Sequence, residues 1–348
     1  MMKLGLSLSG KLLTPANFRF SRQMGATHLI AHLNDYTRVG QPPVPGTPPI
    51  PLWTDARLQT LKDAVNAEGL VLEGVENFDP SHWSDILLDG PRKAEQMAGL
   101  KEIIRALGRV GIPVMGYNFS IAAVWGHAHG PWARGGARTV GYIEGVSPAQ
   151  TPIPNGTVWN MVYDHDAPPG DIGTVTSEQL WSRLEYFLTE LVPVAEEAGV
   201  RLAAHPDDPP LESLRGTARL VNRPELYQRL LDIVPSHYNA LEFCQGTTAE
   251  MRGEMDVYEA IERYATQDKL AYVHFRNVQG QVPNYREVFL NEGDVDMIRA
   301  LRLYRKHGYD GVLIPDHTPL PDCDAPWHAG MARALGYMRA AIDRVEAE

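Results

Sequence analysis

The sequence predicts an α/β protein whose single domain is a closed (β/α)8 barrel, the TIM barrel. Two observations predict this fold. Eight short apolar stretches alternate with segments of helical pattern, and polar residues gather at the C-terminal ends of those stretches. Alternation of strands and helices is typical of a parallel sheet, and eight such units are enough to close it into a barrel.

The first half of the chain follows this alternation through four strands. The strands are expected at residues 3–9, 27–33, 70–76 and 112–119. The helices are expected at residues 17–24, 54–68 and 93–110. Thr54 is a capping residue for the second of these helices, and a glycine follows the end of each one. A connection at residues 41–51 is too rich in proline for regular structure.

The alternation stops after the fourth expected strand. Residues 120–176 are rich in Gly, Pro, Trp and His and show no long periodic segment. We interpret this stretch as a long insertion within a single domain that spans residues 1–348. It is either a lid or binding loop over a site, or a solvated excursion at a subunit contact.

From Ser177 the alternation resumes and completes the eight units. Helices are expected at residues 177–198, 223–233, 255–264, 296–307 and 327–347. Strands are expected at residues 201–205, 238–244, 270–276 and 311–317. The alternative is a doubly wound open sheet, which more typically has five or six strands and a glycine-rich phosphate turn after the first. The turn at residues 9–13 lacks that fingerprint.

The composition argues against several kinds of partner. The net charge of -11 disfavours binding to nucleic acid and to anionic membranes. No apolar run approaches the roughly 20 residues needed to cross a bilayer. The N-terminal stretch is typical of a first strand rather than of a signal peptide. Because there are only two cysteines, Cys244 and Cys323, a reduced cytoplasmic protein is the simplest interpretation, and Cys323 has no assigned role.

Four residues at the ends of four different expected strands form a candidate metal site. They are His205, Cys244, His274 and Asp316, and strand ends converge on one mouth in a barrel. Two imidazoles, a thiolate and a carboxylate suit a divalent transition ion such as Mn²⁺, Fe²⁺, Co²⁺ or Zn²⁺, whereas a cysteine disfavours Mg²⁺ and Ca²⁺. The alternative for Cys244 is a small buried hydrophobic residue. A lone His or Asp at a strand end is more often structural.

Other polar residues at the same strand ends are candidates for contacts with a substrate. His317 could act as an acid or base near neutral pH, or it could be a surface histidine. Arg276 could hold a substrate carboxylate in bidentate fashion, or it could pair with a neighbouring carboxylate. The remaining candidates, which could bind substrate hydroxyl groups or simply pack, are Tyr117, Asn118, Asp207 and Glu76.

Several segments resemble the mannonate dehydratase family, in the family's order. The long and specific one is residues 187–210, which ends in Arg-Leu-Ala-Ala-His-Pro-Asp-Asp-Pro-Pro. The short ones are Gly-Tyr-Asn-Phe at 116–119, Phe-Cys-Gln-Gly at 243–246, Val-His-Phe-Arg at 273–276, Leu-Asn-Glu-Gly-Asp-Val-Asp-Met at 290–297 and Pro-Asp-His at 315–317. The similarity extends from about Gly25 to the end of the sequence.

This resemblance implies a TIM barrel of the xylose-isomerase-like kind. It implies a lyase of carbohydrate metabolism, in glucuronate catabolism, that uses Mn²⁺ or Fe²⁺. Such an enzyme removes water from D-mannonate, or a related aldonate, to give a 2-keto-3-deoxy sugar acid. The resemblance also implies that His205, Cys244, His274 and Asp316 bind the metal and that His317 is catalytic. A family tyrosine near the C-terminus aligns with Trp327 or His328. The candidates for the second catalytic residue are His328 and Tyr117.

The chain departs from the family pattern at several positions. Ile314 replaces an arginine before Pro-Asp-His, Phe289 replaces a histidine, and Glu292 is additional. These departures keep two alternatives open: a metal-dependent sugar isomerase or epimerase on the same barrel, and a catalytically inactive protein that binds sugar acids. We expect a cytoplasmic homo-oligomer that acts on a small sugar acid, with no nucleic-acid or membrane partner.

Overall fold

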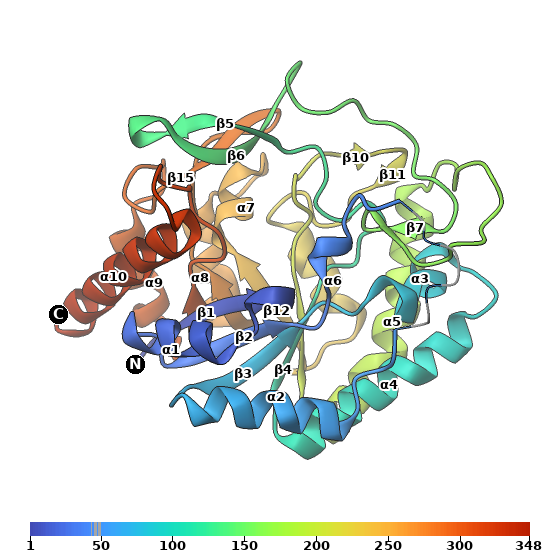
Figure 1. The fold of residues 1–348 in the computed structure, drawn as a ribbon, viewed down its shortest axis with the longest axis horizontal. Coiled ribbons are helices and arrows are strands. Elements are labelled where there is room, and N and C mark those ends of the chain that lie inside the picture. Colours follow the sequence, from blue (N-terminus) through green and yellow to red (C-terminus); the bar gives the residue numbers. More distant parts are fainter. Residues whose placement is uncertain (43, 45–46, 48–49) are drawn as a thin grey trace.

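Eight parallel strands close the barrel in the order β1-β16-β13-β12-β9-β4-β3-β2, and the main helices surround it (Figure 1). The computed structural model describes residues 1–42, 44, 47 and 50–348, so part of the proline-rich connection at 41–51 lies outside the described residues. The predicted single (β/α)8 barrel is confirmed. Its strands are β1 (Lys3–Ser9), β2 (His28–His32), β3 (Val71–Glu76), β4 (Val114–Tyr117), β9 (Arg201–Ala204), β12 (Asn239–Cys244), β13 (Leu270–His274) and β16 (Val312–Ile314).

The helices begin and end close to the predicted positions. The α-helices are α1 (Pro15–Gln23), α2 (Asp55–Ala67), α3 (Pro80–Leu88), α4 (Lys93–Val110), α5 (Ser177–Ala198), α6 (Leu226–Ile233), α7 (Gln245–Glu250), α8 (Val257–Thr266), α9 (Met297–Lys306) and α10 (Pro326–Glu346). Short 3-10 turns are η1 (Gly10–Leu12), η2 (Tyr36–Arg38) and η3 (Arg134–Gly136). The Thr54 side chain accepts a hydrogen bond from the Arg57 amide and caps α2, as predicted. Helices α3 and α7 were not predicted.

Side chains alternate between the inside and the outside of the barrel along each strand, because successive residues of a strand point to opposite faces. A small apolar cluster fills the inside: Ile30, Val114, Ala203, Ala240, Ala271, Tyr272, Val312 and Ile314. The larger cluster lies between the strands and the helices and includes Leu241 and Phe243 of β12 and Leu184 of α5. This alternation places Glu242 and Cys244 of β12 on the same face as Ala240, toward the inside of the barrel.

The region 120–176 contains regular structure that the sequence did not predict. It forms β5 (Ala128–Ala133), β6 (Ala137–Ile143), β7 (Thr157–Val158) and β8 (Met161–Val162). Strands β5 and β6, drawn in green at the top of Figure 1, join a second hairpin in a four-stranded sheet of order β14-β15-β6-β5. That hairpin is β14 (Asn277–Gln281) and β15 (Asn284–Val288), and a further small hairpin is β10 (Ser213–Leu214) and β11 (Thr217–Ala218). Among the described residues, none of the helices combines the length and the apolar character needed to span a bilayer.

Candidate metal centre and active site

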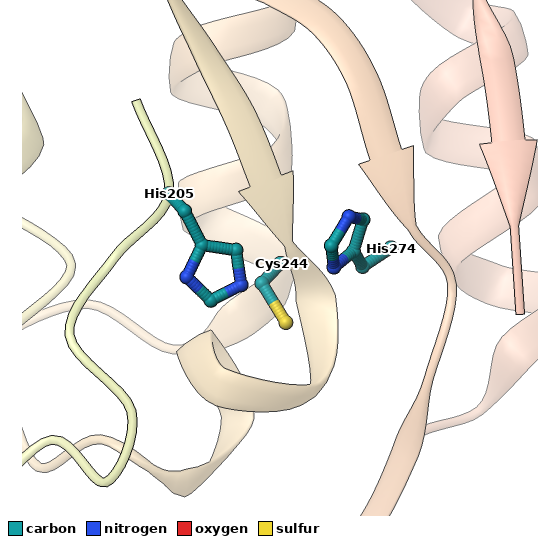
Figure 2. Close-up of side chains that lie close together, drawn as sticks. All are labelled: His205, Cys244 and His274. Atoms are coloured by element: carbon teal, nitrogen blue, oxygen red, sulfur yellow. The ribbon is translucent and has the colours of Figure 1, made fainter. Parts of the chain in front are cut away.

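The structure brings the four candidate metal ligands together at the C-terminal end of the barrel. One ligand atom from each of His205, Cys244 and His274 lies within 4.8 Å of the other two. Figure 2 shows the two imidazole rings on either side of the thiol. Asp316 Oδ2 lies 3.4 Å from His274 Nδ1. The convergence follows from the topology, because the residues stand at or just beyond the C-terminal ends of β9, β12, β13 and β16.

The chemistry of this donor set fits a divalent transition ion. Among the described residues, neither buried ring nitrogen of His274 forms a hydrogen bond of regular geometry, although carboxyl oxygens of Glu242 and Asp316 lie 3.0 Å from Nε2 and 3.4 Å from Nδ1. A buried polar group without a regular hydrogen bond is unusual. Burial disfavours the Cys244 thiolate, but the Arg276 guanidinium, 3.5 Å from the sulfur, and the two imidazoles outweigh it and hold the pKa of Cys244 well below its usual value. The thiolate is the form of cysteine that binds metals.

The backbone around the centre sets the orientation of His205. Its Nδ1 lies 2.6 Å from the carbonyl oxygen of Pro206, which can only accept a hydrogen bond. Asn118 donates to the same carbonyl at 2.9 Å. Nδ1 of His205 therefore carries the proton, and Nε2 is the nitrogen left for a metal.

Two buried carboxylates lie beside His274 inside the barrel. Glu242 Oε1 is 3.0 Å and Glu76 Oε2 is 3.7 Å from His274 Nε2. Burial, reinforced by the nearby Glu76, raises the pKa of Glu242 to about 7. Burial also opposes ionisation of Glu76, but His32 and His274 outweigh it and lower the pKa of Glu76 to about 2. Glu242 was not selected as a site residue, although its position two residues before Cys244 on one strand was a usable signal.

A cavity of about 310 Å³ opens onto the metal centre. Several predicted site residues line it: Glu76, Asn118, His205, His274, Asp316 and His317. Further polar lining residues, which were not predicted to bind substrate, are His32, Tyr36, Asn77 and Asp208. The Tyr36 hydroxyl accepts a hydrogen bond from Asn77 Nδ2 at 2.7 Å. Another cavity, of about 520 Å³, is lined by Lys3, Glu73 and Arg201 near the N-terminal ends of the strands and contains none of the predicted site residues.

His317 lies at the edge of the first cavity, held between two carboxylates. Its Nδ1 is 2.5 Å from Glu287 Oε2 and its Nε2 is 3.2 Å from Asp316 Oδ2. Burial alone would lower the pKa of His317, but Asp316 and Glu287 raise it to about 9. Asp316 has a left-handed backbone, with φ of 59°, which is uncommon for a residue other than glycine and clusters at functional sites.

The structure corrects the prediction for Arg276. Its side chain is 1% exposed, and its guanidinium contacts Glu287 at 2.5 Å, Asp208 at 3.0 Å and Glu250 at 3.4 Å. These ion pairs match the alternative interpretation, so Arg276 is not available to a substrate carboxylate. The sequence offered no signal for Glu287, because β15 was not predicted.

Two further groups of side chains could hold a metal ion: Glu76, Glu242 and His274, which shares His274 with the candidate centre, and His127, Asp208 and Glu287. The last of these belongs to the same ion-pair network as Arg276. The Tyr285 hydroxyl donates to Asp208 Oδ1 at 3.0 Å and lies 2.7 Å from His127 Nε2. Glu287 is already engaged by Arg276 and His317. Because its donor atoms are already satisfied within the protein, we assign this cluster to structure rather than to metal binding.

Three further predictions are corrected by the positions of the side chains. Tyr117 faces outward from β4 and packs on Phe187 of α5, with ring centroids 5.0 Å apart. His328 Nε2 lies 3.0 Å from Asn17 Oδ1, its ring packs edge-on against Phe20, and it is not among the residues that line the first cavity.

Asp207 is the third of these. It accepts hydrogen bonds from the amides of Leu220 and Val221 and pairs with Arg219 at 3.2 Å. These partners use the Asp207 carboxylate for structure. Its neighbour Asp208 is the aspartate that lines the first cavity.

Comparison with known proteins agrees with the sequence motifs. A family model described as D-mannonate dehydratase (UxuA) matches residues 44–142 and 171–343. The mannonate dehydratase of Streptococcus pneumoniae is 30% identical over 277 residues, which are 76% of this chain and 74% of that protein. The mannonate dehydratase of Oceanobacillus iheyensis is 30% identical over 315 residues, which are 85% of this chain and 87% of that protein.

Solved structures show the same relationship. The crystal structure of mannonate dehydratase from Streptococcus suis serotype 2 superposes with a TM-score of 0.79 at 25% identity, over 99% of this chain and 94% of that one. D-psicose 3-epimerase from Clostridium cellulolyticum H10 superposes with a TM-score of 0.57 at 13% identity, over 99% of each chain, and shares the fold alone. The family match covers most of the chain, and these relatives align along most of their own length. The chain therefore belongs to the mannonate dehydratase family.

Proposed function

We propose that this protein is a metal-dependent hydro-lyase that removes water from D-mannonate, or a related aldonate, to give a 2-keto-3-deoxy sugar acid. One observation carries this proposal. In a chain of the mannonate dehydratase family, three side chains that could bind a metal and Asp316 meet next to His317, at the wall of a cavity of about 310 Å³. A cavity of this size accommodates a small polyhydroxy acid.

His205, Cys244, His274 and Asp316 would hold the ion, for which we propose Mn²⁺ or Fe²⁺. When bound, such an ion acts as a Lewis acid toward the oxygen atoms of the substrate. The surrounding residues fix the ligands: the Pro206 carbonyl orients His205, and Glu242 lies against the far nitrogen of His274. Such contacts are typical of metal-binding histidines.

The elimination breaks the C2–H and C3–O bonds of the acid. A base takes the proton from C2, the C3 hydroxyl leaves as water after receiving a proton, and the resulting enol becomes the 2-keto acid. His317 is placed for one of these proton transfers, because Glu287 holds its Nδ1 while the ring borders the cavity. Tyr36 lines the cavity, and its hydroxyl group is suited to bind a substrate hydroxyl, whereas Tyr117 and His328 are not among the lining residues.

The direct test is to incubate the purified protein, loaded with Mn²⁺ or Fe²⁺, with a panel of aldonates. We expect a product that is lighter by one water and carries a 2-keto group, formed only when the metal is present. The His317→Asn variant, treated in the same way, is expected to form little product. The absence of such a product from every aldonate, with either metal, would contradict the proposal.

Two other outcomes would identify the alternatives. Incorporation of solvent deuterium into the sugar without loss of water would indicate an isomerase or epimerase. Binding of an aldonate with no turnover, in the presence of metal, would indicate a binding protein. Assembly into a homo-oligomer stays a prediction, which the mass of the particle in solution would test.

A further inference from the structure

A cavity of about 520 Å³, distinct from the one near the N-terminal ends of the strands, lies next to the first cavity and is partly lined by the β5–β6 hairpin; we call it the second cavity. The two cavities share the side chains of Val39, Val124 and His317. Residues before, within and after the hairpin line the second cavity, among them Trp125, His129 and Arg138. His317 therefore stands where the two cavities meet, and a ligand bound beside it can extend into both.

Backbone pairing holds Arg138 beside the segment that follows His317. Its amide donates to the Leu320 carbonyl at 3.1 Å, and the Leu320 amide donates to the Arg138 carbonyl at 2.7 Å. Leu320 belongs to the segment that follows His317 directly in the sequence. The neighbouring Thr139 hydroxyl donates to the backbone carbonyl of Glu287 at 2.9 Å. Glu287 is the residue whose carboxylate holds His317.

The Arg138 side chain is exposed and lines the second cavity. Within the described part of the chain, its guanidinium forms no hydrogen bond or ion pair. The carboxylate that lines this cavity is that of Glu287, and its two oxygens are already engaged by Arg276 and His317. Arg138 is thus a cation with no counterion among the described residues, in a cavity that His317 also lines.

The two cavities differ in the groups that they offer. The first presents amides and a phenol, from Asn77, Asn118 and Tyr36, which are suited to hydrogen bonds with hydroxyl groups. It also presents imidazoles and carboxyl groups, from His32, His205, His274, Glu76, Asp208 and Asp316. The proposed metal ion would take up several of these groups. The second cavity presents Arg138, whose planar guanidinium matches the geometry of a carboxylate.

We propose that Arg138 binds the carboxylate of the sugar-acid substrate. The hydroxyl-bearing carbons of the substrate then occupy the first cavity, and its C2 and C3 atoms lie beside His317. This inference rests on the proposed function, and it gives Arg138 the role that the sequence suggested for Arg276. The β5–β6 hairpin becomes the element that selects an acid over a neutral polyol.

The test compares Arg138→Gln with a matched control, Arg134→Gln. Arg134 is an exposed arginine of the same hairpin, and its guanidinium stacks on the ring of Phe289 at 5.3 Å. Arg134 is not among the residues that line the second cavity. Isothermal titration calorimetry with the Mn²⁺-loaded protein would measure the affinities for D-mannonate and for D-mannitol, a neutral polyol of the same length. Thermal unfolding of each variant would check that the fold is intact.

We expect Arg138→Gln to weaken D-mannonate binding by about tenfold to a hundredfold, the usual effect of losing a hydrogen bond to a charged group. Binding of D-mannitol should stay unchanged, and Arg134→Gln should alter neither affinity. The inference is overturned if Arg138→Gln binds D-mannonate as tightly as the wild type, if it loses affinity for both ligands equally, or if the wild type does not prefer the acid.

The two proposals can fail separately. If the wild type dehydrates no aldonate but Arg138→Gln selectively weakens D-mannonate binding, the proposed function fails while the inference holds. If dehydration occurs and Arg138→Gln leaves both the D-mannonate affinity and the KM unchanged, the inference alone fails.

Discussion

Glu242 and His274 meet inside the barrel, where Glu242 Oε1 lies 3.0 Å from His274 Nε2. The other ring nitrogen of His274 lies 3.4 Å from Asp316 Oδ2. The ring therefore has one nitrogen toward the other candidate metal ligands and the other toward a buried carboxyl group. Such a carboxyl group fixes the orientation of the ring and strengthens the histidine as a ligand.

Replacing Glu242 by Gln should therefore weaken metal binding without removing a ligand. We expect the affinity for Mn²⁺ to fall by about 10–100-fold, as measured by calorimetric titration of the metal-free protein. The control is Glu73→Gln, because Glu73 pairs with Lys3 at 3.2 Å beside the cavity near the N-terminal ends of the strands. Equal Mn²⁺ affinities in Glu242→Gln and the wild type would show that Glu242 does not support His274.

Replacing Arg276 by Gln should affect the stability of the protein more than its affinity for substrate. In this variant three carboxyl groups would stay buried without the guanidinium with which all of them now pair, those of Asp208, Glu250 and Glu287. Breaking a buried ion pair from one side typically costs about 3–5 kcal/mol, so we expect a loss of this size in the free energy of unfolding, measured in urea.

The control for this experiment is Arg286→Gln. Arg286 is an exposed residue of β15 whose guanidinium contacts the Gln279 side chain at 2.8 Å, and a surface change of this kind usually shifts stability by less than about 0.5 kcal/mol. A stable Arg276→Gln variant with only a raised KM would restore Arg276 as a substrate-binding residue.

The two histidines that the sequence suggested for catalysis, His317 and His328, should respond differently to substitution. His317→Asn should lower kcat by about 10²–10⁴-fold, the usual contribution of a positioned acid or base. His328→Asn should leave kcat close to that of the wild type, because the His328 side chain contacts Asn17 and Phe20 and does not line the first cavity. Steady-state rates of water loss from the same aldonate would compare them. A similar loss of kcat in both variants would contradict the placement of His328 outside the site.

The space beside Gly116 is needed by the buried carboxyl groups. A Cβ atom at this position would lie 2.1 Å from the Tyr272 hydroxyl oxygen and 2.5 Å from Glu242 Oε2. Gly116→Ala should therefore destabilise the protein by about 1–3 kcal/mol, as overpacking typically does. Combining it with Tyr272→Phe, which removes the nearest atom, should recover part of that loss in thermal unfolding.

Gly336→Ala is the control for Gly116→Ala. Gly336 lies within α10, and a Cβ atom there would meet no atom within 4 Å, so alanine should stabilise the helix by about 0.4–1 kcal/mol. If Gly116→Ala were also stabilising, the packing inside the barrel would be looser than the structure shows.

Signals that lie within a few residues of one another were read correctly from the sequence. The apolar stretches of strands such as β9 and β12 and the cap at Thr54 are local patterns. A closed barrel brings its strand ends to one mouth, so four residues far apart along the chain could be placed together. The β5–β6 and β14–β15 hairpins were missed, because they are joined by pairing between distant segments, such as Tyr142 with Tyr285.

The incorrect site residues failed for reasons of packing. Tyr117 stands at the end of a barrel strand, as predicted, but it points outward to Phe187, whereas Gly116 points inward. From the sequence, Arg276 was a reasonable partner for a substrate anion. In the structure it pairs instead with Glu287 of β15, a strand that was not predicted. Neither outcome can be read from residue type or from position along a strand.

The periodicity of the apolar residues and the order of the strands were thus sufficient to predict the barrel and the set of side chains that could bind a metal. Packing between distant segments assigned the remaining roles. It engaged Arg276 in ion pairs and left Arg138 exposed, with no ion pair among the described residues, in a cavity that His317 also lines. The physical reason is that secondary structure and strand order depend on neighbouring residues, whereas the charge balance of a buried group depends on every segment packed against it.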